Sequence, residues 1–238
     1  MKHPLLLPAT LILLAACTTI TSTPVANPTS SPTEEVTSMQ NIRYLALGDS
    51  YTIGEKVDEH DRWPNQLATL LENENLQADV TIIARTGWTV QELWQGIQAN
   101  PPEGTYDMVS LLIGVNDQYR DYPMDGYRED FRSMLAKAIE YAGGDPKRVV
   151  VLSIPDWSVT PFAQGSDRRQ IAKDIDMFNS VNREETEKTG AYYVDITPGS
   201  REAEKDQSLI ATDGLHPSGK MYAKWAKKTL PIALEILK

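Results

Sequence analysis

Cysteine is nearly absent from this sequence, which has a single one, Cys17, among 238 residues. A disulfide needs two cysteines, and a thiolate metal cluster needs several. The sequence therefore excludes a disulfide within the chain and a thiolate metal site. It also excludes a cysteine nucleophile anywhere after residue 17.

Basic residues are also in deficit, with 23 Lys and Arg against 33 Asp and Glu and a formal net charge of −10. Nucleic-acid partners require a basic surface, which this composition does not favour. The chain also lacks a Gly-x-Gly-x-x-Gly or Gly-Lys-Ser/Thr pattern that would cradle a phosphate. These absences argue against a nucleic-acid partner and against a nucleotide-binding flavodoxin-like protein.

The apolar run at residues 5–16 is too short to span a bilayer but is typical of a signal-peptide core. Residues 14–17, Leu-Ala-Ala-Cys, resemble the bacterial lipobox, in which the cysteine carries the lipid. We predict a lipoprotein signal peptide at residues 1–16 and an anchor on Cys17 in the bacterial cell envelope. The residue after the cysteine is Thr18 and not Asp, and this favours an anchor in the outer membrane or on the periplasmic face. An ordinary signal peptide cleaved near the same site is the other interpretation.

A composition rich in Thr, Ser and Pro follows the cysteine. Residues 18–40 hold seven Thr, four Ser and three Pro, and so offer little apolar surface to bury. We predict a flexible, lipid-anchored linker over residues 17–40 and a folded domain over residues 41–238. The sequence does not predict the oligomeric state.

Short apolar runs alternate with amphipathic stretches after residue 41, which predicts a parallel sheet covered by helices on both faces. The fold class is therefore α/β, a three-layer α/β/α sandwich with a five-stranded parallel sheet in the flavodoxin-like order. We expect every strand to be buried on both faces, Pro217 to open the last helix, and Pro231 to kink or interrupt it. The expected strands are 42–47, 80–84, 108–113, 149–154 and 192–196, and the expected helices are 63–73, 89–98, 125–142, 168–188 and 217–229.

Four short motifs fall where loops should face the crevice beyond the carboxyl ends of the strands. They read Gly-Asp-Ser-Tyr at 48–51, Arg-Thr-Gly-Trp at 85–88, Gly-Val-Asn-Asp at 114–117 and Asp-Gly-Leu-His-Pro at 213–217. A serine on a tight turn before a helix is a candidate nucleophile, and it needs a base. Three histidines occur, one of them in the predicted signal peptide, which leaves His60 or His216.

An aspartate three residues before His216 favours that histidine as the base. Asp213 can hold one ring nitrogen while the other faces Ser50. The tetrahedral intermediate of acyl transfer also needs hydrogen-bond donors. The backbone N–H groups of Ser50 and Gly87 and the side-chain amide of Asn116 could supply three.

In this order, the four motifs resemble the conserved blocks of the SGNH (GDSL) hydrolase family. The resemblance implies Ser50 as nucleophile, Asp213 and His216 as the rest of a catalytic triad, and an oxyanion hole of Ser50, Gly87 and Asn116. It implies a carboxylic ester hydrolase that uses no metal or organic cofactor. One departure is Tyr51, where many members have leucine. This departure weakens any inference about substrate from the lipases of the family.

Each of these residues also has a purely structural interpretation. Ser50 could cap a helix, and Asn116 with Asp117 could form only a turn. Asp49 and Asp117 are expected to support loops by hydrogen bonding. Residues 58–61 read Asp-Glu-His-Asp, side chains that can bind a metal ion. A run of charged side chains in solvent is the commoner explanation for such a sequence.

The sequence leaves several classes of substrate open. We expect short acyl esters, first of all those of carbohydrates, because the predicted envelope location and the aromatic loop with Trp157 and Phe162 suit glycans. Trp88, Tyr119 and Tyr122 are further candidates for the mouth of the crevice. A lysophospholipase or thioesterase acting on longer acyl chains is one alternative. A catalytically silent lipoprotein that binds a glycan or acyl chain is another.

Overall fold

The computed structural model describes residue 15 and residues 39–238. Its centre is a five-stranded, all-parallel sheet in the order β2-β1-β3-β4-β5, which confirms the predicted flavodoxin-like order. The strands are β1 (Gln40–Gly48), β2 (Leu76–Ala84), β3 (Met108–Leu112), β4 (Val149–Leu152) and β5 (Tyr192–Val194).

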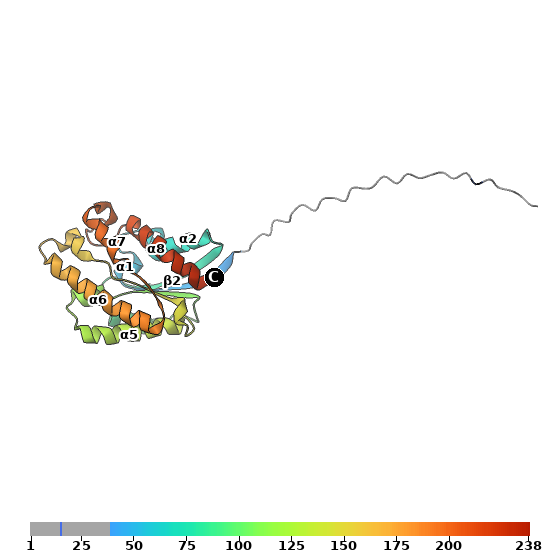
Figure 1. Cartoon of the computed structure of the whole chain (residues 1–238), viewed down its shortest axis with the longest axis horizontal. Helices are drawn as coiled ribbons and strands as arrows, with labels where there is room; N and C mark the ends of the chain where they lie inside the picture. Colours follow the sequence, from blue (N-terminus) through green and yellow to red (C-terminus); the bar gives the residue numbers. More distant parts are fainter. Residues whose placement is uncertain (1–14, 16–38) are drawn as a thin grey trace, which may run out of the picture. The chain divides into compact units, whose positions relative to one another are not determined.

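Helices cover both faces of the sheet and confirm the three-layer α/β/α sandwich (Figure 1). On one face α2 packs against α8, and on the other α5 packs against α3 and α6. The helices are α1 (Ser50–Ile53), α2 (Trp63–Glu72), α3 (Val90–Ala99), α4 (Val115–Tyr119), α5 (Met124–Tyr141), α6 (Arg168–Thr189), α7 (Thr197–Ser200) and α8 (Gly219–Leu237).

Burial differs between the central and the edge strands. All residues of β3 and β4 are buried, and β1 is buried from Tyr44 to Gly48. The edge strands β2 and β5 are mostly half-buried, so the expectation that every strand is covered on both faces is wrong for these two. An edge strand has a neighbour on one side only, and fewer helices lie over it.

The last helix differs from expectation at both ends. It begins at Gly219 with Ser218 as its N-cap, and Pro217 instead forms an isolated bridge with Ile210. It then continues through Pro231 to Leu237 as one helix. Proline removes the hydrogen bond to the carbonyl four residues earlier. Here Pro231 and Lys227 are both exposed, so water can satisfy that carbonyl while Ala233 stays packed in the core.

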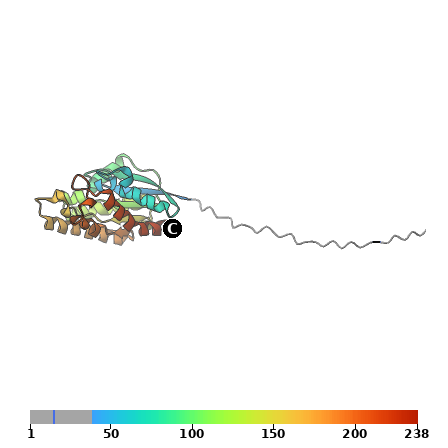
Figure 2. The ribbon, with the colours of Figure 1, turned by 90° about the horizontal axis from the view of Figure 1, so that it is seen from above.

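The two chain ends that the structure describes lie together, away from the carboxyl ends of the strands (Figures 1 and 2). The Gln40 N–H donates to the carbonyl of Asn75, and Lys238 pairs with Glu74 at 2.8 Å. The chain therefore enters this domain at the amino end of β1.

The predicted signal peptide, the lipidation site Cys17 and most of the predicted linker lie outside the described residues. Across residue 15 and residues 39–238, no helix combines the length and the apolar character that a bilayer crossing needs.

Candidate active site

A pocket of about 170 Å³ opens beyond the carboxyl ends of β1 and β3. Its lining brings together Ser50, Gly87, Asn116 and His216, which come from four separate segments of the chain. Asp213 lies behind His216, hydrogen-bonded to its ring. The tertiary structure thus places four of the five residues predicted from the sequence in the lining of one cavity, with the fifth, Asp213, bound to His216.

Ser50 is the first residue of the short helix α1, on a tight turn after β1. Asp49 caps this helix, and its Oδ1 accepts a hydrogen bond of 2.9 Å from the N–H of Tyr51. A Cβ on Gly48 would lie 2.2 Å from Thr52 Oγ1 and 2.5 Å from the Leu112 carbonyl oxygen, so no other residue fits there. Glycine therefore lets the chain turn closely enough to bring Ser50 to the pocket.

His216 is buried, and its Nδ1 lies 2.6 Å from Asp213 Oδ2. The other carboxylate oxygen, Oδ1, accepts the backbone N–H groups of Leu215 and His216, each at 3.0 Å. Partial burial opposes ionisation of Asp213, but these hydrogen bonds outweigh it and lower its pKa below the ordinary value. An ionised Asp213 favours the His216 tautomer with a proton on Nδ1 and a free Nε2.

Ser50 and His216 line the same pocket, but no hydrogen bond joins their side chains in the part of the chain that the structure describes. Tyr51 packs edge-on against the His216 ring with centroids 5.7 Å apart, which restricts the ring's position. Hydrogen bonds between nucleophile and base are often long in an empty site and tighten when substrate binds.

The three predicted oxyanion donors belong to residues that line the pocket. Among the described residues, no group accepts a hydrogen bond from the backbone N–H of Ser50 or of Gly87. The φ of Gly87 is +86°. The Asn116 amide donates one N–H to the Trp88 carbonyl at 2.9 Å, which leaves its second N–H for the pocket. Asn116 therefore holds the Gly87 loop in place as well as facing the pocket, a structural role that the sequence did not predict.

Asp49 and Asp117 support the loops around the site, as predicted. Asp117 accepts the N–H of Val90 at 3.1 Å and so fixes the start of α3, and Asp49 caps α1. Burial raises the pKa of Asp117 to about 6. Burial, together with the nearby Asp117 charge, raises the pKa of Asp49 to about 8.

These raised pKa values predict how stability depends on pH. The folded state keeps a proton on Asp49 that the unfolded chain releases near its ordinary pKa of 3.8, so stability falls as pH rises toward about 8. We expect Asp49→Asn to weaken this fall, because an amide can still accept from Tyr51 and does not ionise. Urea unfolding at pH 5 and pH 8 measures it. Equal pH dependence in the two proteins would contradict an elevated Asp49 pKa.

Arg120, a residue that the sequence analysis missed, holds the other side of the Gly87 loop. Its Nη2 donates to the Gly87 carbonyl at 2.6 Å, and its Nη1 pairs with Glu92 at 3.2 Å. Arg120 follows Asn116 by four residues, which places both on one face of α4. The four-residue spacing could have indicated this role, because it lets Asn116 and Arg120 bind the Trp88 and Gly87 carbonyls of the same loop.

We expect Arg120→Met to lower kcat for a small ester by about tenfold, because the Gly87 peptide would lose a charge-assisted hydrogen bond. Arg120→Lys should retain more activity. Arg85→Met is the matched control, since Arg85 is exposed in the same loop and no hydrogen bond to its side chain is present among the described residues. Equal kcat values for Arg120→Met and Arg85→Met would refute the positioning role.

Three aromatic rings form one wall of the pocket. Tyr119, Trp157 and Phe162 lie with centroids 5.6 to 6.2 Å apart, and Trp157 donates its indole N–H to Gln118 at 2.8 Å. Tyr119 and Phe162 are exposed at the mouth, whereas Trp157 is buried beneath them. A flat ligand can therefore stack on this wall.

The other two aromatic candidates do not line this pocket. Trp88 packs against Gly96, where a Cβ would lie 2.2 Å from the indole ring, and so belongs to the contact with α3. The Tyr122 hydroxyl accepts a hydrogen bond from Gln91 of α3.

The charge run at residues 58–61 stays in solvent. His60 is exposed and lies 3.7 Å from Asp61, its neighbour in sequence. Within residues 39–238, no three His, Cys, Asp or Glu side chains are grouped so that they could hold a metal ion.

Comparison with known proteins gives three findings. Residues 46–224 match the model of the GDSL-like lipase/acylhydrolase family. An acetylxylan esterase from Geobacillus stearothermophilus is 26% identical over 125 residues, which are 47% of this chain and 52% of that protein. The chain thus spans about half the length of the curated relative it matches.

Solved structures share the fold. The crystal structure of an acetylxylan esterase from Geobacillus stearothermophilus superposes with a TM-score of 0.64 at 20% identity, over 82% of this chain and 96% of that one. A member of the lipolytic G-D-S-L protein family from Veillonella parvula gives a TM-score of 0.55 at 20% identity, over 79% and 96% of the two chains.

Proposed function

Because the chain belongs to the GDSL-like lipase/acylhydrolase family, we propose that it is a carboxylic ester hydrolase that acts through an acyl-enzyme on Ser50. One observation carries this proposal. Ser50, His216, Gly87 and Asn116 line a single pocket of about 170 Å³, and Asp213 is hydrogen-bonded to His216.

In the first half of the proposed reaction, Ser50 Oγ attacks the ester carbonyl carbon, and His216 Nε2 takes the hydroxyl proton. Asp213 stabilises the resulting imidazolium through the 2.6 Å contact at Nδ1. The N–H groups of Ser50 and Gly87 and the second N–H of Asn116 stabilise the oxyanion. His216 then gives its proton to the departing alcohol, which leaves an acyl group on Ser50.

In the second half, a water molecule attacks the acyl-enzyme while His216 takes a proton from it. The same donors stabilise the second oxyanion, and collapse of this intermediate releases the carboxylic acid and returns the proton to Ser50. Each half of the reaction uses only residues of this chain.

For the substrate we propose short, acetyl-type esters carried on carbohydrate. The pocket of about 170 Å³ is smaller than the roughly 300–1,000 Å³ of sites for drug-sized ligands, which favours a small acyl group. The exposed rings of Tyr119 and Phe162 at its mouth suit the apolar face of a sugar. The relative from Geobacillus stearothermophilus, an acetylxylan esterase, also supports this choice.

The experiment that tests this function is hydrolysis of p-nitrophenyl acetate, butyrate, octanoate and palmitate by the purified protein, followed by acetate release from acetylated xylan. We expect kcat/KM to fall with acyl length. A rise toward the longer chains would instead support a lysophospholipase or thioesterase. No hydrolysis of any ester would support a silent binding protein.

We also propose that the protein is lipid-anchored through Cys17 in the cell envelope. Because the described chain begins at the amino end of β1, an anchor before it would attach at the end of the domain opposite the pocket. Cys17→Ser should move the protein from the membrane fraction to the soluble fraction of a bacterial host. Unchanged membrane fractionation with incorporation of labelled lipid would refute the anchor.

A further inference from the structure

A second hollow lies between α3 and α5, outside the pocket that holds Ser50. It has a volume of about 360 Å³ and is lined by Val90, Gln91, Trp94, Gln95, Asp130 and Ser133. We call it the α3–α5 groove. We propose that this groove binds a sugar unit of a neutral oligosaccharide whose acetylated unit occupies the Ser50 pocket. This proposal rests on the proposed function.

The groove has the chemical composition that recognises a neutral sugar. Trp94 is partly buried against the core and also lines the groove, so it offers a fixed aromatic surface. The side-chain amide of Gln91 donates to Tyr122 Oη and to Asp130 Oδ2, each at 2.9 Å, and is thereby held in position. These bonds use both N–H groups of Gln91, and the Ser133 hydroxyl donates to the Glu129 carbonyl. The Gln95 amide therefore supplies the donors, and the side-chain oxygens of Gln91, Gln95 and Ser133 supply acceptors. Beside an aromatic face, this set matches the hydroxyl groups and C–H face of a sugar.

The charges of the groove select against anionic glycans. Asp130 is the one ionisable side chain of its lining, and no Lys or Arg lines it. The whole chain carries a formal net charge of −10. A uronic acid or a phosphorylated sugar would therefore meet a carboxylate without a compensating cation, whereas a neutral sugar would not.

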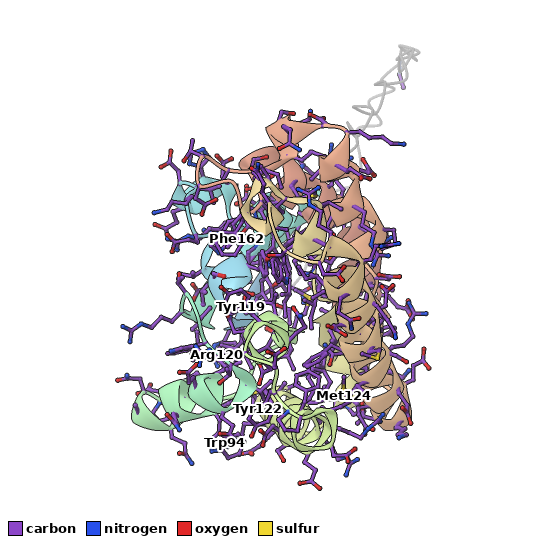
Figure 3. All side chains as sticks on the ribbon, turned by 90° about the vertical axis from the view of Figure 1, so that its left-hand side faces the viewer. Trp94, Tyr119, Arg120, Tyr122, Met124 and Phe162 are labelled. Carbon is purple, nitrogen blue, oxygen red and sulfur yellow. The ribbon has the colours of Figure 1, made fainter. Side chains whose placement is uncertain are left out.

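One short, continuous segment of chain links the groove to the active-site mouth. Tyr119 stands at the mouth, Arg120 follows it, and Tyr122 reaches the groove through its hydrogen bond to Gln91. Figure 3 shows Phe162, Tyr119, Arg120, Tyr122 and Trp94 following one another along the same end of the molecule. Arg120 also pairs with Glu92 of α3 and so bridges the two sites.

This continuity is why an extension of the substrate is the proposed occupant. A sugar chain with its ester group at Ser50 leaves the pocket past Tyr119 and Phe162, the exposed rings of the aromatic wall. Its next units would cross Arg120 and Tyr122 and bring one ring over Trp94. The groove then adds affinity for oligomers but none for a small ester.

The test compares two substrates in two variants. Trp94→Leu should raise KM for acetylated xylo-oligosaccharides of four to six units by about fivefold to tenfold, and change kcat/KM for p-nitrophenyl acetate by less than about twofold. Gln98→Ala is the matched control on α3, because Gln98 is exposed and does not line the groove. Gln95→Ala serves as a second groove variant that leaves the core intact.

A binding measurement separates failure of the groove from failure of the proposed function. Isothermal titration calorimetry measures the binding of unacetylated xylohexaose and cellohexaose to Ser50→Ala. Saturable binding that Trp94→Leu abolishes and Gln98→Ala preserves supports the groove, even if the enzyme releases no acetate from glycans. Binding of neither sugar, or equal binding in the Trp94→Leu variant, would overturn the groove while leaving the esterase proposal intact.

Discussion

Ser50→Ala is expected to lower kcat for p-nitrophenyl acetate by at least about 10⁴-fold, because it removes the hydroxyl that forms the acyl-enzyme beside His216. Among the described residues the Ser50 side chain makes no hydrogen bond. Its removal should therefore change the free energy of unfolding by less than about 1 kcal/mol. The measurements are steady-state kinetics and urea unfolding followed by tryptophan fluorescence.

Ser166→Ala is the matched control, since Ser166 is exposed on a surface loop and does not line the pocket. It should retain full activity. Wild-type turnover in Ser50→Ala would remove Ser50 as the nucleophile. The N-cap of α1 is Asp49 and not Ser50, so the structural interpretation of Ser50 as a helix cap is wrong. A large fall in the stability of Ser50→Ala would mean that this serine stabilises the fold in another way.

Gly114→Ala is expected to lower the free energy of unfolding by about 2–5 kcal/mol and to abolish most activity. The φ of Gly114 is +119°, and a Cβ there would lie 2.2 Å from Tyr127 Oη and 3.0 Å from Ile154 Cδ1. Tyr127 is buried and donates to Asn182 at 2.6 Å, so it cannot move aside freely. The substitution must therefore displace the start of α4, which carries Asn116.

Gly165→Ala is the control that separates backbone strain from steric overlap. Gly165 has a similar positive φ of +89°, but a Cβ there would meet nothing within 4 Å. We expect it to cost only about 1 kcal/mol and to leave activity unchanged. Urea unfolding and the acetate assay measure both variants. Similar losses in the two would contradict the steric explanation for Gly114.

Local sequence determined much of the site because its parts are short-range. Asp213 and His216 are three residues apart, and one carboxylate can reach both the backbone and the ring within a single turn. Gly48 and Ser50 lie on the tight turn that the end of a strand and the start of a helix require. Such patterns depend on backbone geometry and side-chain chemistry, which the sequence carries directly.

The alternation of apolar and amphipathic segments likewise determined the sheet, because parallel strands need crossover helices and these have one favoured hand. It did not distinguish β2 and β5 from the central strands, since edge and centre differ only in which neighbours the fold provides. The sequence also suggested a break at Pro231. Only the packed structure shows that Lys227 and Pro231 both lie on the exposed side of the helix, which continues to Leu237.

Tertiary structure alone decided which side chains meet across loops. The rings of Trp88, Tyr119 and Tyr122 looked equivalent in sequence, yet only Tyr119 joins Trp157 and Phe162 at the pocket. Arg120 reaches the Gly87 carbonyl from 33 residues away, and Gln91 reaches Asp130 from 39. Contacts of this kind depend on how whole helices pack, because a shift of one helix by a fraction of a turn would separate these groups.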